Sequence, residues 1–147
     1  MKEIIRQVSE MLESNEVYLV GGSVRDILLN KTPKDYDFCT SLDPDIIEER
    51  VKKAGRKAYL VGKRFGTVGC KFEVNGEWQI IEITTFRNET YTYGSRKPAV
   101  TFSTNIHEDL SRRDFTINAM AMKSSGKLID PFNGQQDLKD GIIRCVS

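Results

Sequence analysis

The first residues of the chain carry an apolar repeat of helical period. Apolar side chains recur every three or four residues at Ile4, Ile5, Val8, Met11 and Leu12. Polar and charged side chains occupy most of the positions between them, so the pattern predicts an amphipathic helix over residues 3–13. The next apolar run, VYLV at 17–20, is short and rich in residues that favour strands.

Two adjacent glycines interrupt the pattern after VYLV. The helical period then resumes at Val24, Ile27 and Leu28, so the segment predicts a strand, a glycine turn and a helix. A turn containing Pro33 follows, and DYDFCT at 35–40 is predicted to be a strand.

A second helix and three strands are predicted in the middle of the chain. Asp43-Pro44 is a typical helix start and Gly55 a typical helix end. Strands are predicted over 57–61, 67–74 and 77–86. Between the last two, Asn75-Gly76 predicts a tight hairpin, because a type I′ turn needs positive φ at both central residues.

The remaining pattern is more irregular. Residues 87–104 have few periodic apolar positions, which favours a loop with a mobile tip. Residues 105–122 predict a helix, and residues 128–143 predict a turn, a short helix and a strand. This mixture, with an antiparallel hairpin, indicates an α/β or α+β fold.

Composition narrows the class of protein. The 147 residues are the length of one ordinary domain, and the net charge is +1. Basic clusters at 52–57, 62–64 and 95–98 fit either solvated faces or a local basic groove. The longest apolar runs fall far short of the roughly 20 residues that a membrane helix needs. The amphipathic start does not resemble a secretory signal, so we expect a cytoplasmic protein without membrane partners.

The three cysteines are widely spaced. Cys39, Cys70 and Cys145 form no CxxC pair, and the chain has one histidine. This spacing favours plain reduced thiols over a zinc site or a disulfide framework.

The glycine turn is the first candidate for chemistry. Gly21 and Gly22 would let a ligand approach the backbone, and the start of the following helix attracts anions. Arg25, about one turn into that helix, could reach the same anion. The spacing matches neither a dinucleotide-binding loop nor a Walker loop, and a glycine pair also occurs for turn geometry alone.

Asp35 and Asp37 are the second candidate. In a strand, residues two apart face the same side, so these carboxylates would converge while Tyr36 and Phe38 point into the core. Two neighbouring carboxylates repel each other unless a cation lies between them, and oxygen ligands beside a phosphate suit Mg²⁺. An isolated DxD is also common in surface turns.

Glu82 is the best candidate for a third carboxylate, because it interrupts the apolar run IIEI. Three carboxylates could hold two metal ions for a displacement at phosphorus. The alternative is an edge strand with Glu82 in solvent.

The segment SRRDF adds positive charge. Arg112 and Arg113 could grip a triphosphate, or they could pair only with neighbouring acids such as Asp109 and Asp114.

Four segments in this order resemble a known family: LVGGSVRDILL, KDYDF, EDLSRRDFTINAMAM and IDPFNGQQDL. They are similar to the catalytic head domain of class II tRNA nucleotidyltransferases (the CCA-adding enzymes) and of bacterial poly(A) polymerases, within the polymerase β-like nucleotidyltransferase superfamily. The similarity spans roughly residues 15–147. It implies an α/β (α+β) head with a mixed, mostly antiparallel sheet flanked by helices.

The resemblance also implies roles for the candidate residues. Asp35 and Asp37 would bind Mg²⁺, with Glu82 as the third catalytic acid. The residues implied to bind ATP or CTP are Gly21, Gly22, Arg25, Arg112, Arg113 and Asp114. The implied reaction is template-independent attack of an RNA 3′-hydroxyl, such as the CCA end of tRNA, on the α-phosphorus, with pyrophosphate leaving.

In this family, neck, body and tail domains follow the head, and the neck selects the base with an EDxxR motif. EDLSR at 108–112 fits that motif, but it runs directly into RRDFT and is therefore interpreted as part of the head. We expect residues 1–147 to be a single head domain that lacks the later domains. A catalytically incomplete nucleotide- or RNA-binding module is the alternative function.

Overall fold

The computed structural model describes residues 2–91 and 98–147. Within them, seven strands form one sheet in the order β3-β4-β5-β2-β1-β8-β9, and β6 and β7 form a separate ribbon. The strands are β1 Val17–Val20, β2 Asp37–Thr40, β3 Ala58–Tyr59, β4 Thr67–Val74, β5 Glu77–Thr85, β6 Arg87–Tyr91, β7 Pro98–Phe102, β8 Ala121–Met122 and β9 Leu128–Ile129. The helices are α1 Lys2–Leu12, α2 Gly22–Leu28, α3 Pro44–Lys53, α4 Ile106–Ser111 and α5 Gly134–Asp140, with 3₁₀ turns η1 Lys63–Phe65 and η2 Thr116–Asn118.

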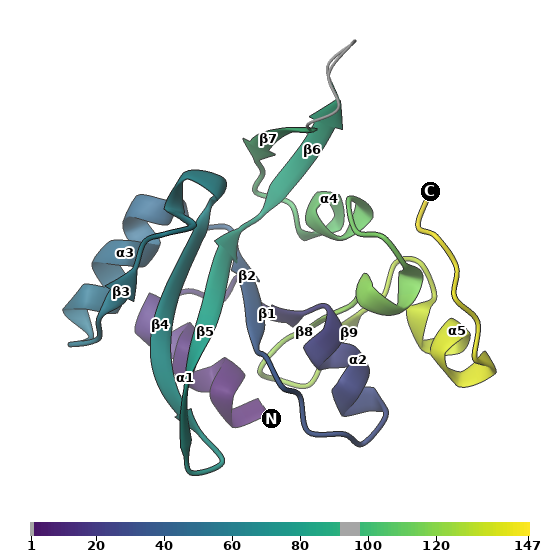
Figure 1. Cartoon of the computed structure of the whole chain (residues 1–147), viewed down its shortest axis with the longest axis horizontal. Helices are drawn as coiled ribbons and strands as arrows, with labels where there is room; N and C mark the ends of the chain where they lie inside the picture. The colour runs from purple at the N-terminus through teal and green to yellow at the C-terminus, as the bar shows by residue number, and fades with distance from the viewer. Residues whose placement is uncertain (1, 92–97) are drawn as a thin grey trace.

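The sheet is mixed, as predicted. Its neighbouring strands pair antiparallel except for β2 and β5, which run parallel. Figure 1 shows α1 and α3 behind β4 and β5, and the β6–β7 ribbon extending away from the main sheet. The predicted class, a mostly antiparallel sheet flanked by helices, is confirmed.

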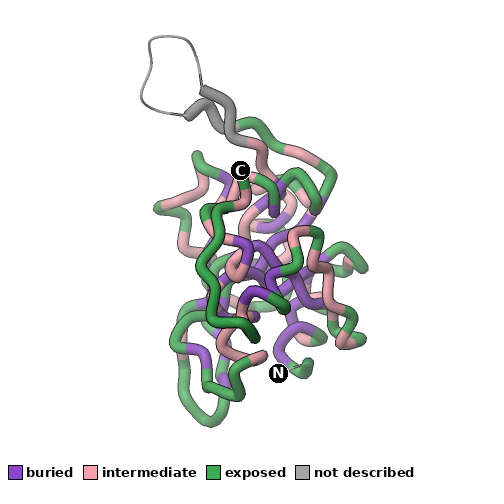
Figure 2. Tube along the Cα trace, turned by 90° about the vertical axis from the view of Figure 1, so that its right-hand side faces the viewer, coloured by how far each residue is buried: buried purple, intermediate pink, exposed green. Residues whose placement is uncertain are grey.

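The core lies between the sheet and helices α1 and α3. The predicted apolar stripe of α1 is confirmed, since Ile5, Val8 and Leu12 are fully buried. They pack with Ile47 and Val51 of α3 against the inward side of the sheet. Figure 2 shows this buried centre inside an exposed periphery. Burial of this apolar surface is the main stabilising contribution, because each fully buried aliphatic side chain contributes about 1.5–3 kcal/mol.

The hairpin between β4 and β5 forms at the predicted turn. Asn75 and Gly76 have φ angles of 53° and 80°, which are the two positive values that a type I′ turn requires. Exposed and buried residues alternate along the second half of β5, where Ile81 and Ile83 are inside. One face of this hairpin therefore covers the core and the other faces outward.

Several predicted elements differ from the structure. The strand predicted over 57–61 is confined to β3, because Leu60 and Val61 turn outward into solvent. The loop predicted over 87–104 is wrong where the structure describes it: β6 and β7 pair from Arg87 with Phe102 to Tyr91 with Pro98. The mobile tip predicted for this loop includes residues 92–97, which lie outside the described residues.

The helix predicted over 105–122 is also shorter than expected. Asn105 caps the start of α4, and its side chain accepts a hydrogen bond from the His107 backbone N–H at 2.8 Å. The helix ends at Ser111, and the chain continues through η2 into β8. The predicted C-terminal strand is reduced to an isolated bridge between Phe115 and Cys145.

Within residues 2–91 and 98–147, every helix is too short or too polar to span a bilayer. Cys39 and Cys70 are buried and Cys145 is exposed, and all three are free thiols.

Candidate active site

Two of the predicted carboxylates lie side by side on neighbouring strands. Asp37 opens β2 and is level with Glu82 of the parallel strand β5. Tyr36 and Phe38 are each 1% exposed, so the predicted division between outward acids and inward aromatics is confirmed. Asp35 precedes the strand rather than lying in it. All three carboxylates nevertheless line one cavity of about 290 Å³, together with Tyr36 and Ile80.

The surroundings of Asp37 in this cavity raise the pKa of its carboxyl, although the residue is exposed. Its pKa is raised above the usual 3.8, first because the surrounding protein removes water from the carboxylate. The negative charges of Glu82 and Asp35 raise the pKa further, and the positive charge of Arg113 lowers it. The acids therefore repel one another, and a bound cation would relieve that repulsion.

Glu82 is not on an edge strand. Strand β5 lies between β4 and β2, so the edge-strand alternative is wrong. The residue is exposed because its position on β5 faces outward, whereas Ile81 and Ile83 face the core. The charge thus interrupts the apolar run without being buried.

The oxygen donors of this cavity suit a hard divalent cation such as Mg²⁺. In the described part of the chain, however, no three His, Cys, Asp or Glu side chains are grouped closely enough to hold a metal ion. The donor chemistry fits, whereas the side chains do not form a closed set of ligands.

The glycine turn connects β1 to α2, as predicted. Gly21 has φ 72°, a value that side chains with a Cβ rarely adopt. A Cβ at Gly21 would lie 3.4 Å from Nη1 of Arg113, and one at Gly22 would lie 3.2 Å from Nη2 of Arg25. The bare backbone therefore lies directly against two guanidinium groups, one from each predicted nucleotide-binding segment.

Arg25 is held by a short chain of hydrogen bonds. Its Nη1 donates to Oδ1 of Asn118 at 2.9 Å, and its Nε and Nη2 lie 3.4 Å from Oδ1 of Asp26. The Asn118 amide nitrogen donates to Oδ1 of Asp114 at 3.3 Å, and that oxygen also accepts the Phe115 N–H at 2.6 Å. Asp114 therefore positions Asn118, which positions Arg25.

Asn118 was not among the sequence candidates. Spacing alone gives no signal for it, because the chain between Asp114 and Asn118 is extended at Phe115 before η2 begins.

Arg112 and Arg113 share one buried acid. Asp109 is 0% exposed, and its carboxylate lies 3.3 Å from Nη2 of Arg112 and 3.1 Å from Nη2 of Arg113. The same carboxylate accepts the backbone N–H of Arg87 at 3.0 Å, at the start of β6. The structural alternative, pairing with a neighbouring acid, is thus confirmed for both arginines. This pairing uses only part of the Arg113 guanidinium. Its Nε is buried without a hydrogen-bond partner, and its Nη1 lies against Gly21.

A second cavity of about 440 Å³ joins the two motifs. Its lining residues are Gly22, Ser23, Arg25, Asp26, Lys31, Thr32, Lys34, Asp35 and Asp37. It shares Asp35 and Asp37 with the carboxylate cavity. Its volume is within the range of small-molecule sites.

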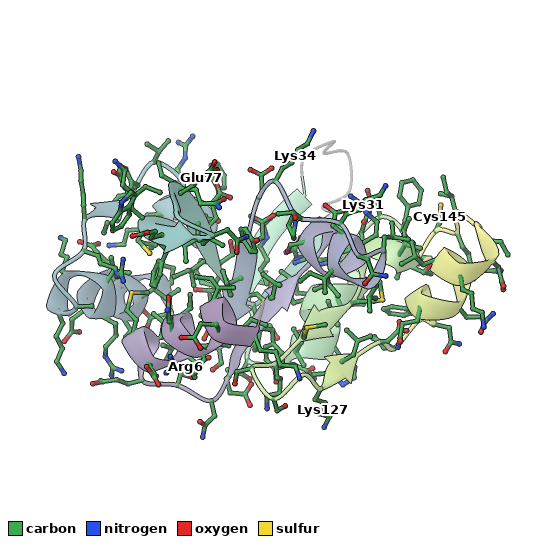
Figure 3. The ribbon with its side chains drawn as sticks, turned by 90° about the horizontal axis from the view of Figure 1, so that it is seen from below. Arg6, Lys31, Lys34, Glu77, Lys127 and Cys145 are labelled. Atoms are coloured by element: carbon green, nitrogen blue, oxygen red, sulfur yellow. The ribbon has the colours of Figure 1, made fainter. Side chains whose placement is uncertain are left out.

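Lys31 and Lys34 also line this cavity and were missed by the sequence reasoning, which interpreted their segment only as a turn. Figure 3 shows both lysines on one side of the molecule, opposite Arg6 and Lys127. Their position beside the DxD sequence was the available signal.

Comparisons with known proteins identify the family of the chain. The pattern of the poly A polymerase head domain matches residues 17–144. A CCA-adding enzyme of Lactobacillus helveticus is 49% identical over 89% of this chain and 31% of its own length. One from Staphylococcus aureus is 42% identical over 98% of this chain and 35% of its own length.

Solved structures give the same result. The crystal structure of the Bacillus stearothermophilus CCA-adding enzyme in complex with CTP has a TM-score of 0.77 and 38% identity, covering 99% of this chain and 32% of that one. A tRNA nucleotidyltransferase complexed with a primer tRNA and an incoming ATP analog has a TM-score of 0.70 and 34% identity, covering 97% and 39%. The chain spans about a third of the length of its relatives. On its sequence and fold, it belongs to the poly A polymerase head domain family.

Proposed function

We propose that this chain is the catalytic head of a tRNA nucleotidyltransferase, which transfers nucleotides from CTP or ATP to the CCA end of tRNA and releases pyrophosphate. The observation that carries the proposal is the pair of cavities that share Asp35 and Asp37. One cavity is lined by a guanidinium, two ammonium groups and a glycine backbone, and the other by three carboxylates. The relatives solved with CTP and with primer tRNA support the same substrates.

The triphosphate would lie in the larger cavity. Arg25 and Lys31 carry the positive charge that a triphosphate needs, and Gly22 leaves room for a phosphate to approach the backbone. The bond between Arg25 and Asn118 fixes the guanidinium before the ligand arrives, so less conformational freedom is lost on binding. Arg113 would add charge at Gly21, where its Nη1 lies.

The carboxylates Asp35, Asp37 and Glu82 would hold Mg²⁺. When bound, Mg²⁺ stabilises negative charge on the attacking and leaving oxygens of an in-line displacement at phosphorus. The outward position of Asp37 and Glu82 leaves their cavity open to an RNA 3′ end. Binding and orientation of both substrates are the contributions of these residues to the reaction.

We also propose that residues 1–147 form one head domain, and that base selection and the grip on tRNA depend on further domains of a longer parent. The chain spans about a third of the length of its relatives, which supports this arrangement.

The test is nucleotide incorporation by the longer parent protein, because the grip on tRNA is proposed to depend on its further domains. The parent protein is incubated with Mg²⁺, labelled CTP or ATP, and a tRNA that lacks its terminal CCA. Asp35→Ala and Asp37→Ala are expected to reduce incorporation by more than about 100-fold, the loss typical of removing one charge-stabilising group. Glu49→Ala, an exposed carboxylate of α3, is the matched control and should retain activity. Normal transfer by either aspartate variant would refute the assignment.

A nucleotide-binding module without turnover is the second candidate. It is favoured by the lack of a closed set of metal ligands in the described residues. Saturable CTP or ATP binding with no incorporation by the unmodified parent protein would support this candidate over the enzyme.

A further inference from the structure

The outward face of β4 and β5 carries apolar side chains beyond the carboxylates. Trp78, Ile80 and Glu82 alternate along β5 and face outward, whereas Ile81 and Ile83 face the core. Trp78 is 65% exposed and Ile80 is 50% exposed. The solvent side of an antiparallel sheet is ordinarily polar, so large apolar residues in this position point to a partner.

Tyr59 of β3 extends this apolar face. A Cβ on Gly69 of β4 would lie 3.3 Å from both Cγ2 of Ile80 and Cβ of Tyr59, so these two side chains close over the glycine from opposite strands. We name Trp78, Ile80 and Tyr59 the outer strip.

Two lysines border the outer strip. Lys71 is the cross-strand neighbour of Ile80, and the Lys57 ammonium lies 5.1 Å from the centroid of the Tyr59 ring. Glu73 is the cross-strand neighbour of Trp78, so the charge around the strip is mixed.

The strip is accessible from the side on which the site opens. Figure 1 shows α1 and α3 behind β4 and β5, and in the described part of the chain no helix covers their outer face. Figure 3 shows Glu77, at the start of β5, on the same side of the molecule as Lys31 and Lys34. The outer strip and the proposed triphosphate cavity therefore share one side of the molecule.

The outer strip also runs directly into the carboxylates. Ile80 lines the cavity that contains Asp35, Asp37 and Glu82. The strand advances four residues from Trp78 to Glu82, which is a distance of roughly 13 Å at about 3.3 Å per residue. That distance is about the rise of four stacked nucleotides at ~3.4 Å. An RNA whose 3′-hydroxyl reaches the carboxylates could thus place on Trp78 a base that lies a few nucleotides upstream.

We propose that the outer strip binds the single-stranded 3′ segment of the RNA substrate, with a base stacked on Trp78 and phosphates near Lys71 and Lys57. The inference rests on the proposed function, which supplies RNA as the substrate. Aromatic side chains exposed on a sheet stack nucleic-acid bases whatever their sequence. Because Glu73 lies beside Trp78, stacking rather than charge supplies most of the affinity. Two lysines facing two phosphates predict a log–log salt slope of about −1.4, which is shallow for nucleic-acid binding.

The chain contains one tryptophan, so its fluorescence reports on this face directly. The experiment titrates the whole chain with a single-stranded RNA 12-mer ending in CC, up to about 1 mM, which exceeds the ~10⁻⁴ M of weak nucleic-acid binding. We expect saturable quenching of Trp78. By fluorescence anisotropy of labelled RNA, Trp78→Ala should weaken binding by roughly 5- to 150-fold, and Trp78→Phe should retain most of it. Ile143→Ala, an apolar residue 72% exposed near the C-terminus, is the matched control and should bind RNA normally.

CTP binding separates this inference from the proposed function. Trp78→Ala should bind CTP as the unmodified chain does, because Trp78 does not line the triphosphate cavity. Unchanged RNA affinity in Trp78→Ala would overturn the inference, and so would a lack of RNA binding by the unmodified chain. In either case, CTP binding and nucleotide incorporation would leave the proposed function in place. Trp78 fluorescence that falls with rising protein concentration in the absence of RNA, together with dimers in analytical ultracentrifugation, would assign the outer strip to a second copy of the chain. That result would also overturn the inference.

Discussion

Arg25 and Asn118 lie 93 residues apart in the chain, and their side chains are joined by a 2.9 Å hydrogen bond. The bond links the segment that contains the glycine turn to the segment that follows the paired arginines. Each segment alone is a motif of ambiguous meaning, whereas the bond connects the second segment to Arg25, which lines the larger cavity. The contact also gives Asn118 a positioning role, since it bonds Arg25 rather than lining the cavity itself.

Replacing Asn118 with alanine should weaken CTP binding by roughly tenfold, the value of one hydrogen bond to a charged group. Arg25 would keep only its two long contacts with Asp26, and its guanidinium would no longer be fixed over Gly22. Isothermal titration calorimetry measures the affinity, and circular dichroism confirms the fold. Asn118→Asp keeps an acceptor for Arg25, but it places a second carboxylate against Oδ1 of Asp114 and adds negative charge beside the triphosphate, so it should not restore the binding. Equal affinity for CTP in Asn118→Ala and the unmodified chain would remove the positioning role.

Asp109→Ala should lower the free energy of unfolding by about 3 kcal/mol, because it leaves Arg112 and Arg113 without their buried acid. It also removes the acceptor for the Arg87 N–H, so the start of β6 should loosen. Urea unfolding measures the loss. Glu108→Ala, at the exposed neighbouring position of α4, is the control and should change stability by less than about 0.5 kcal/mol. A similar loss of unfolding free energy in both variants would show that the burial of Asp109 and its pairing with the arginines do not stabilise the fold.

The elements with a regular apolar period could be predicted from the sequence. Helix α1 and the β4–β5 hairpin were predicted nearly to their ends, because local burial and one turn determine them. The helix predicted over 105–122 was wrong after Ser111 because its later apolar residues, such as Met120 and Ala121, are buried by tertiary packing at η2 and β8 rather than along one helix face. Periodicity alone does not distinguish these two cases.

The candidate site shows the same limit. Asp35, Asp37, Gly21 and Arg25 were found because their chemistry is local in sequence and their spacing fits a turn and a strand. Glu82 was also a candidate, because it interrupts an apolar run. Its exposure was expected only on an edge strand, whereas β5 is an inner strand and Glu82 lies on its outward face. Asn118 was missed because only the fold brings its partner Arg25 near it. Asp109 was named only as a possible partner of the two arginines, because its bond to the Arg87 N–H is likewise set by the fold.

Gly134→Ala should destabilise the contact between α5 and η2. A Cβ at Gly134 would lie 2.2 Å from the backbone oxygen of Thr116, a distance that requires the backbone to move. We expect a loss of about 1–3 kcal/mol or more, the typical cost of overpacking. Thermal unfolding measures it, and Gln136→Ala, at an exposed position of the same helix, is the control. An unchanged Tm in Gly134→Ala would show that α5 can shift away from η2 at no cost.

Asp137 should make the same contact sensitive to acid. Its carboxylate accepts the Thr116 hydroxyl at 2.6 Å and Nε of Arg144 at 3.1 Å, and these two bonds lower its pKa below the usual 3.8. A carboxyl whose pKa falls on folding stabilises the folded state above its unfolded pKa, and that contribution is lost as the pH falls through the folded value. Asp137→Asn should therefore have a lower Tm than the unmodified chain near pH 7, with the difference shrinking below about pH 3.8. Calorimetry across this range measures both curves. A difference that stays constant down to about pH 2 would show that the charge of Asp137 does not stabilise the fold.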